Sequence, residues 1–226
     1  KKVLLIDLDP HGNASSGVGV SIRDLKTSLY DCLTTGASPK DSVVPTSWKN
    51  LSLLPASTRL AALYTELPAT MRDRVLKLKQ TIEKLDENEV DIILIDAPPS
   101  LGLLTVNALV ASDSVILPVQ AEYYALEGIT QLLQIVQKVQ KSANPKLSIL
   151  GVLLTMYDQR TTLSKQVQDE LSNHFGDLLF KTVIPRNIRL AEAPSHGIPI
   201  SEYDKWSKGA RSYKALSKEV MNRTGV

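Results

Sequence analysis

Six short, continuous apolar runs constrain the fold of this 226-residue chain more than any other feature of its sequence. Runs of this kind are typical of strands that are buried on both faces of a parallel sheet. Helical spacing of apolar residues separates most of them, at Arg72–Leu85, Leu126–Val139 and Thr162–Phe175. The alternation predicts an α/β fold of three layers, in which helices flank a mainly parallel, twisted sheet. The runs are Val3–Asp7, Leu51–Leu54, Ile92–Asp96, Val115–Val119, Leu147–Leu154 and Thr182–Ile184.

Composition narrows the class of protein and of partner. The net charge is only +2, so any affinity for nucleic acid has to come from a local basic patch. Cys32 is the only cysteine, which excludes an intrachain disulfide and fits a reducing cytoplasm. No apolar run approaches the roughly 20 residues of a membrane helix. Because the sequence shows neither repeats nor an evident linker, residues 1–226 are expected to form a single domain.

Two of the predicted strands end in aspartates. Asp7 and Asp9 follow the first apolar run, in D-L-D-P-H-G-N, and Asp96 ends the third, just before a double proline. Ligands of a parallel α/β sheet gather beyond the carboxyl ends of its strands, where these side chains would meet. Three carboxylates at one edge repel one another unless a cation compensates them. Mg²⁺ with a bound phosphate is the expected compensation, because it takes one or two carboxylates, water and phosphate oxygens.

A simpler interpretation of the same aspartates stays open. Asp and Asn favour helix caps and turns whether or not they bind a ligand. In that case Asp7, Asp9 and Asp96 only shape the turns that follow the strands.

A basic helix is predicted at residues 205–218, K-W-S-K-G-A-R-S-Y-K-A-L-S-K. Arg186 and Arg189 lie in the loop before it. A local cluster of Lys and Arg can neutralise DNA phosphates without reading the bases, although a merely solvated helix face is the alternative. At 100° per residue its basic side chains share an arc of about 120°; these are Lys208, Arg211, Lys214 and Lys218.

Five blocks of sequence, in order, resemble the ParA/Soj branch of the ParA/MinD partition ATPases, and the resemblance covers essentially all 226 residues. The blocks are DLDPHGNASSG, IDAPPSLGLLTVNAL, PVQAEYYALEG, GVLLTMYD and VIPRNIRLAEAPSHG. The resemblance implies a deviant-Walker P-loop NTPase fold and an ATP hydrolase of chromosome or plasmid partitioning. It implies a homodimer that sandwiches ATP, binds double-stranded DNA without sequence preference, and releases it on hydrolysis stimulated by a ParB-type partner. The implied location is the cytoplasm, at the nucleoid, without membrane attachment.

The resemblance also implies roles for individual residues, with ATP and Mg²⁺ as the cofactors. Asp96 would be the Walker B carboxylate that reaches Mg²⁺ through water, Asp7 would lie near the metal, and Asp9 would position or activate the attacking water. His11 stands where the family usually has glutamine. The residues implied to contact adenine are Met156, Pro185 and Asn187, and those implied to contact DNA are Arg186, Arg189, Lys208 and Arg211.

The phosphate-binding loop of the family is not in this sequence, which has no match to G-x-x-x-x-G-K-[ST]. In the family the variant K-G-G-x-G-K-T precedes the strand at Val3, and this chain opens directly on K-K-V-L-L-I-D, so we expect an N-terminal truncation that removes the first strand. We then expect the chain itself to hydrolyse no ATP and to carry an uncovered strand edge and apolar face. The alternatives are a non-enzymatic interaction module that has no P-loop, or a related ATPase that positions another cargo.

Overall fold

The computed structural model of the protein describes residues 1–67, 70–86, 89–123 and 125–226. The chain divides into two compact units, each with its own sheet and its own hydrophobic core. Unit 1 comprises Lys1–Ser112 and Pro194–Pro199, and unit 2 comprises Asp113–Ala193 and Ile200–Val226. The expectation of a single domain over 1–226 stays a prediction.

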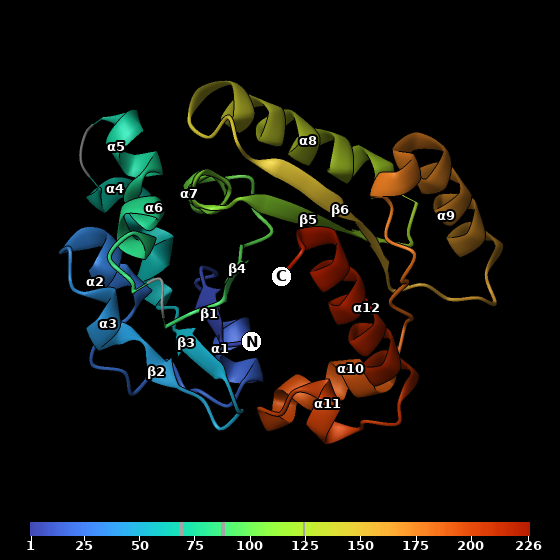
Figure 1. Cartoon of the computed structure of the whole chain (residues 1–226), viewed down its shortest axis with the longest axis horizontal. Coiled ribbons are helices and arrows are strands. Elements are labelled where there is room, and N and C mark those ends of the chain that lie inside the picture. The colour runs from blue at the N-terminus through green and yellow to red at the C-terminus, as the bar shows by residue number, and fades with distance from the viewer. Residues whose placement is uncertain (68–69, 87–88, 124) are drawn as a thin grey trace. The chain divides into compact units, whose positions relative to one another are not determined.

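The sheet of unit 1 has the strand order β2-β3-β1-β4. β1 pairs in parallel with both of its neighbours, β3 and β4, and β2 pairs antiparallel to β3 (Figure 1). The three apolar runs predicted here are therefore strands, and two of them end in the predicted aspartates. The strands are β1 (Val3–Asp7), β2 (Val44–Pro45), β3 (Leu51–Leu54) and β4 (Ile92–Asp96).

Helices of unit 1 bury one face of this sheet. Leu4, Ile6 and Leu54 lie in a single cluster with residues of α2, α4, α6 and α7. On the other face of β4, Leu94 remains 49% exposed. The helical elements are α1 (Asn13–Gly17), α2 (Leu29–Thr34), α3 (Pro39–Ser42), η1 (Thr58–Ala62), α4 (Leu63–Glu66), α5 (Met71–Val75), α6 (Lys77–Ile82) and α7 (Leu103–Ala111), with η3 (Ala193–His196) mostly in this unit.

The prediction of one continuous helix over Arg72–Leu85 is wrong, because the helix breaks at Leu76 into α5 and α6. Asn107 on α7 is fully buried and takes over the backbone groups near the break. Its Oδ1 accepts from the Leu78 N–H (3.1 Å), and its Nδ2 donates to the Arg74 carbonyl (2.9 Å). A buried backbone group needs such a partner, so this asparagine stabilises a break that the apolar spacing does not reveal.

Unit 2 is built around two parallel strands in three layers. Figure 1 shows α8 and α12 on opposite faces of β5 and β6. A hydrophobic cluster lies on each face. In one, Leu117 and Leu154 pack with residues of α8 and α9, and in the other Leu153 packs with Leu216 of α12. The elements are β5 (Ser114–Gln120), β6 (Ser148–Thr155), α8 (Ala125–Ser142), α9 (Thr162–Phe175), η2 (Gly176–Leu178), α10 (Ile188–Glu192), α11 (Ile200–Tyr203) and α12 (Lys208–Thr224).

The strand predicted at Thr182–Ile184 is not formed. The segment follows β6 closely, since the Ile184 N–H donates to the Leu154 carbonyl (2.9 Å). However, the side chain of Glu219 on α12 accepts from the backbone N–H groups of Lys181 (2.8 Å) and Thr182 (2.9 Å). Donors bound to a carboxylate cannot join a ladder, so no strand forms over this segment. Single bridges flank it instead, at Leu179 and Pro185.

The α/β class and the mostly parallel pairing predicted from the apolar runs are confirmed. Among the described helices, none combines the length and the apolar character needed to cross a membrane.

Candidate functional site

The three predicted carboxylates meet at one edge of the unit 1 sheet. Asp7 and Asp96 are direct register partners at the ends of β1 and β4, and the Leu8 N–H donates to the Asp96 carbonyl (2.9 Å). The Asp9 N–H donates to Oδ1 of Asp7 (3.2 Å), which turns the chain back over the strand ends. Parallel pairing thus brings together residues that are almost ninety positions apart, as the sequence predicts.

Asp7 is fully buried and already hydrogen-bonded. Both the N–H (2.7 Å) and the hydroxyl (2.6 Å) of Ser15 donate to its Oδ2, and the same hydroxyl accepts from the Ala56 N–H (3.3 Å). Burial raises the pKa of Asp7, and the donors from Ser15 partly oppose that rise. In this arrangement Asp7 organises the turn that carries Asp9, and its place near a metal stays a prediction. Ser15 was missed by sequence reasoning because no local pattern links it to a carboxylate eight positions away.

Of the three carboxylates, that of Asp96 has the fewest favourable contacts. No described residue donates a hydrogen bond to its side chain. Although the residue is exposed to solvent, desolvation of the carboxyl by the surrounding protein, followed by the charges of Asp7 and Asp9, raises its pKa from 3.8 to about 6. Within the described residues, no group of three or more His, Cys, Asp or Glu is arranged to hold a metal alone. The donor set therefore fits a hydrated Mg²⁺ whose other ligands are water and phosphate.

Asp9 lies at the start of a tight turn and is nearly buried, with 7% of its surface exposed. Gly12 follows with a left-handed φ of 68° and precedes the first residue of α1. His11 contacts Asp9 twice: its backbone N–H (3.0 Å) and its ring Nδ1 (2.7 Å) both reach Oδ1 of the carboxylate. The turn therefore presents the carboxylate of Asp9 in a defined orientation.

A pocket of about 450 Å³ opens beside Asp9 within unit 1. The turn at Asp9–His11, the loop Pro98–Ser100, the start of α7, and residues of η1 and α4 line it. Thr105 stabilises the loop Pro98–Ser100, because its hydroxyl donates to the Ser100 carbonyl. The acidic edge thus has an adjoining space with apolar walls, which is typical of a ligand site.

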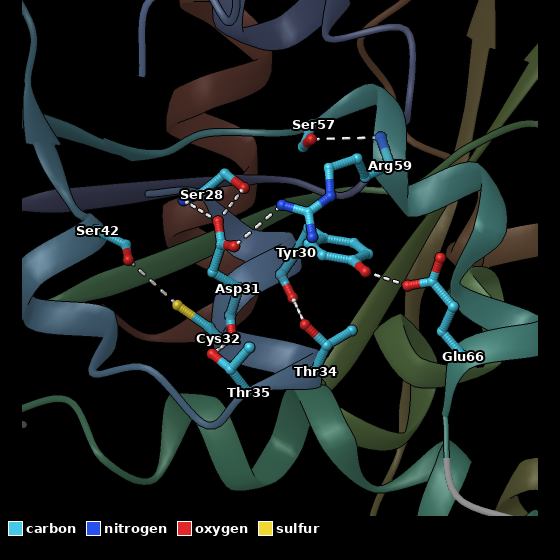
Figure 2. Close-up of polar contacts among 10 residues, drawn as sticks. All are labelled: Ser28, Tyr30, Asp31, Cys32, Thr34, Thr35, Ser42, Ser57, Arg59 and Glu66. Atoms are coloured by element: carbon cyan, nitrogen blue, oxygen red, sulfur yellow. Dashed lines mark hydrogen bonds and ion pairs between the residues drawn. The ribbon is translucent and has the colours of Figure 1, made fainter. Parts of the chain in front are cut away.

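A polar cluster holds the η1–α4 wall of this pocket against α2 (Figure 2). The guanidinium of Arg59 lies 3.7 Å from the centroid of the Tyr30 ring, and its Nη1 is 3.3 Å from Oδ1 of Asp31. The hydroxyl of Tyr30 donates to Glu66 at the end of α4. Cation–π contact and hydrogen bonding thus add to the apolar packing of these short helices, whose Leu60 and Leu63 are buried in the core of unit 1.

The three residues predicted to contact adenine are neighbours in unit 2, beyond the end of β6. Met156 has a left-handed φ of 55°, and the next residue, Tyr157, forms a bridge with Pro185. Asn187 begins α10 as its cap, with its side chain accepting from the Arg189 N–H (2.9 Å). A positive φ is uncommon in residues other than glycine, and such residues are often found at functional sites. The sequence does not predict this backbone conformation at Met156.

The four residues predicted to bind DNA all lie in unit 2 and are exposed, but they differ in their ion pairs. Arg186 pairs with Glu122 (3.3 Å), and Arg189 pairs with Glu192 (2.9 Å) and Asp204 (3.6 Å). Among the described residues, the side chains of Lys208 and Arg211 at the start of α12 form no ion pair. Of these four residues, the two without an ion pair therefore lie on α12, which begins at Lys208 and has Ser207 as its N-cap.

Comparison with known proteins places these features in a family context. Residues 1–149 match the family model of an AAA domain. The chain is 53% identical over 220 residues to the sporulation initiation inhibitor protein Soj of Bacillus subtilis, covering 97% of this chain and 86% of that protein. It is 48% identical to the chromosome-partitioning ATPase Soj of Treponema pallidum, covering 100% of this chain and 87% of that one. It is 45% identical to the chromosome partitioning protein ParA of Caulobacter vibrioides, covering 99% and 84%.

Solved structures share the fold. A cobyrinic acid a,c-diamide synthase from Mycobacterium smegmatis, with bound ADP and magnesium, superposes with a TM-score of 0.80 at 34% identity. The match covers 96% of this chain and 80% of that protein. The predicted P-loop NTPase class is thus confirmed by a nucleotide-binding relative of similar architecture.

Proposed function

Because this chain belongs to the ParA/Soj family of chromosome-partitioning ATPases, we propose that the protein uses ATP hydrolysis with Mg²⁺ to partition chromosome or plasmid DNA. The observation that carries the proposal is the convergence of Asp7, Asp9 and Asp96 at one sheet edge beside a pocket. Their uncompensated charge suits Mg²⁺ and a nucleotide phosphate better than it suits a purely structural turn.

Each carboxylate has a distinct part in this proposal. Asp96, which has no donor among the described residues, would hold a hydrated Mg²⁺, and Asp7 holds the turn that carries Asp9. Asp9 orients the attacking water, whose oxygen bonds to the γ-phosphorus while the bond to the β–γ bridging oxygen breaks, giving ADP and phosphate. Bound Mg²⁺ would supply neutralisation of phosphate charge. In this proposal Met156, Pro185 and Asn187 of unit 2 are the residues that contact adenine.

The DNA-binding state is a homodimer that sandwiches ATP and presents two basic faces. Lys208 and Arg211, with Arg186 and Arg189 nearby in sequence, bind phosphates of double-stranded DNA without sequence preference. A ParB-type partner stimulates hydrolysis, which releases the DNA. The protein acts in the cytoplasm at the nucleoid.

Hydrolysis is tested on the full-length protein with Mg²⁺. Asp9→Ala should lower kcat by at least about 10²-fold while ATP still binds, because the attacking water loses the carboxylate that orients it. Asp96→Ala should raise the Mg²⁺ concentration needed for half-maximal rate. Wild-type turnover by both variants would contradict the proposed site.

DNA binding is tested by the salt dependence of affinity for duplex of random sequence. The double change Lys208→Glu and Arg211→Glu should weaken binding and reduce the slope of log K against log salt by about 0.9 for each phosphate that is no longer neutralised. The double change Lys138→Glu and Lys141→Glu, at exposed positions near the end of α8, is the matched control for an equal charge change elsewhere in unit 2. Equal effects of the control and the double variant would remove α12 from the mechanism.

A further inference from the structure

The contact between His11 and Asp9 is unusual for so exposed a side chain. The His11 side chain is 78% exposed, yet its Nδ1 lies 2.7 Å from Oδ1 of Asp9, whose side chain is only 10% exposed. A carboxylate oxygen accepts hydrogen bonds, so Nδ1 carries the proton in this contact. Since little of the ring is buried, apolar packing does not explain its position, and the polar contact with Asp9 does.

Both donors of His11 bind the same oxygen of the carboxylate. The backbone N–H (3.0 Å) and the ring Nδ1 (2.7 Å) converge on Oδ1, while no described residue donates to Oδ2. The torsion of a carboxylate about its Cβ–Cγ bond is otherwise broad. Two donors on one oxygen narrow that torsion and leave the second oxygen available to another partner.

We infer that His11 is a positioning residue for ATP hydrolysis: its Nδ1–H holds Oδ1 of Asp9 so that Oδ2 is aimed at the attacking water. The inference rests on the proposed role of Asp9. Misplacement of a catalytic group by a fraction of an ångström lowers rate without changing substrate affinity, because the contact acts on the water and not on ATP.

Steady-state hydrolysis by the full-length protein tests this role. His11→Ala keeps the backbone donor but removes the ring, and should lower kcat about tenfold with KM for ATP unchanged within about twofold. His11→Asn offers an amide N–H in the place of Nδ1 and should recover most of that loss. Wild-type kcat in His11→Ala, a parallel rise in KM, or an Asn variant as slow as the Ala variant would each overturn the inference. The thermal unfolding midpoint should be the same in all three proteins, as the ring is exposed.

A spectroscopic readout is independent of turnover. The chain has three histidines, so the imidazole ¹⁵N–¹H correlation spectrum is simple to assign. His11 should show the Nδ1–H tautomer, and Asp9→Ala should return it to the Nε2–H form that free histidine prefers. An Nε2–H form in the wild type would overturn the inference. The two proposals fail separately: full activity in Asp9→Ala refutes the proposed site, whereas an inactive Asp9→Ala beside a fully active His11→Ala refutes only the role of His11.

Discussion

Replacing Asp96 by asparagine should stabilise the protein at neutral pH when Mg²⁺ and nucleotide are absent. Partial desolvation by the surrounding protein, with the charges of Asp7 and Asp9, raises the pKa of this carboxyl from 3.8 to about 6 in the folded state. An acid whose pKa is raised by folding holds its proton more tightly in the folded protein. The folded state therefore loses stability as the pH rises between about 4 and 6, and the full cost is present above that window. Asparagine keeps the shape of the side chain and removes the charge.

The magnitude follows from the shift, with a correction for solvent. A change from 3.8 to about 6 corresponds to about 3 kcal/mol if it is taken whole. Because Asp96 is exposed to solvent, screening reduces the expected gain in the free energy of unfolding to about 1 kcal/mol. Asp158→Asn is the matched control of opposite sign. Hydrogen bonds from Arg160 lower the pKa of Asp158, so losing that charge should not stabilise the protein.

Urea unfolding at about pH 7.5 and about pH 4 checks this reasoning. Asp96→Asn should exceed the wild type by about 1 kcal/mol at the higher pH and match it near the lower one, where the wild-type carboxyl is already protonated. A variant that is less stable than the wild type at pH 7.5, or a gain of equal size at both pH values, would refute the conclusion that the ionised Asp96 carboxylate destabilises the protein when no cation is bound.

Substitutions of Asn107, Arg223 and Gly12, two of them with a comparison variant, test the packing within each unit by the free energy of urea unfolding. Asn107→Leu should cost about 2–4 kcal/mol, because it leaves buried backbone groups of α5 and α6 without partners; a neutral result would mean that the helix break needs no asparagine. Arg223→Ala should cost about 2–3 kcal/mol, because the guanidinium donates to three backbone carbonyls. Arg223→Lys should recover less than half of that loss. Full recovery by lysine would show that only the charge of Arg223 matters. Gly12→Ala should cost about 1–2 kcal/mol, because φ is +68° and the new Cβ would lie 2.8 Å from a side-chain carbon of Ile22. Gly17→Ala is the control and should not change the free energy of unfolding, because the space around Gly17 is open. Equal effects of the two changes would contradict a structural role for the turn at Gly12.

Five of the six predicted strands are present because their signal is local. A continuous apolar run of four to eight residues that is bounded by turn or acidic residues is typical of a strand in a parallel sheet. The two errors have causes that lie far away in the sequence. Glu219 takes the donors of the segment at Thr182 from 37 positions away, and Asn107 supports the break at Leu76 from another helix. A side chain that competes for backbone groups across such a separation leaves no periodic trace.

Residue type and order alone determined that aspartates would stand at the carboxyl ends of two parallel strands, because strand length and polarity are local properties of the chain. Tertiary structure decided what each carboxylate is bound to. Ser15 satisfies Asp7, His11 holds one oxygen of Asp9, and no described residue donates to the side chain of Asp96. Desolvation and neighbouring charge set the pKa of Asp96, and the neighbouring charge of Asp7 depends on the register between β1 and β4. The difference between three similar residues therefore arises from hydrogen-bond partners and desolvation, which exist only once the chain has folded.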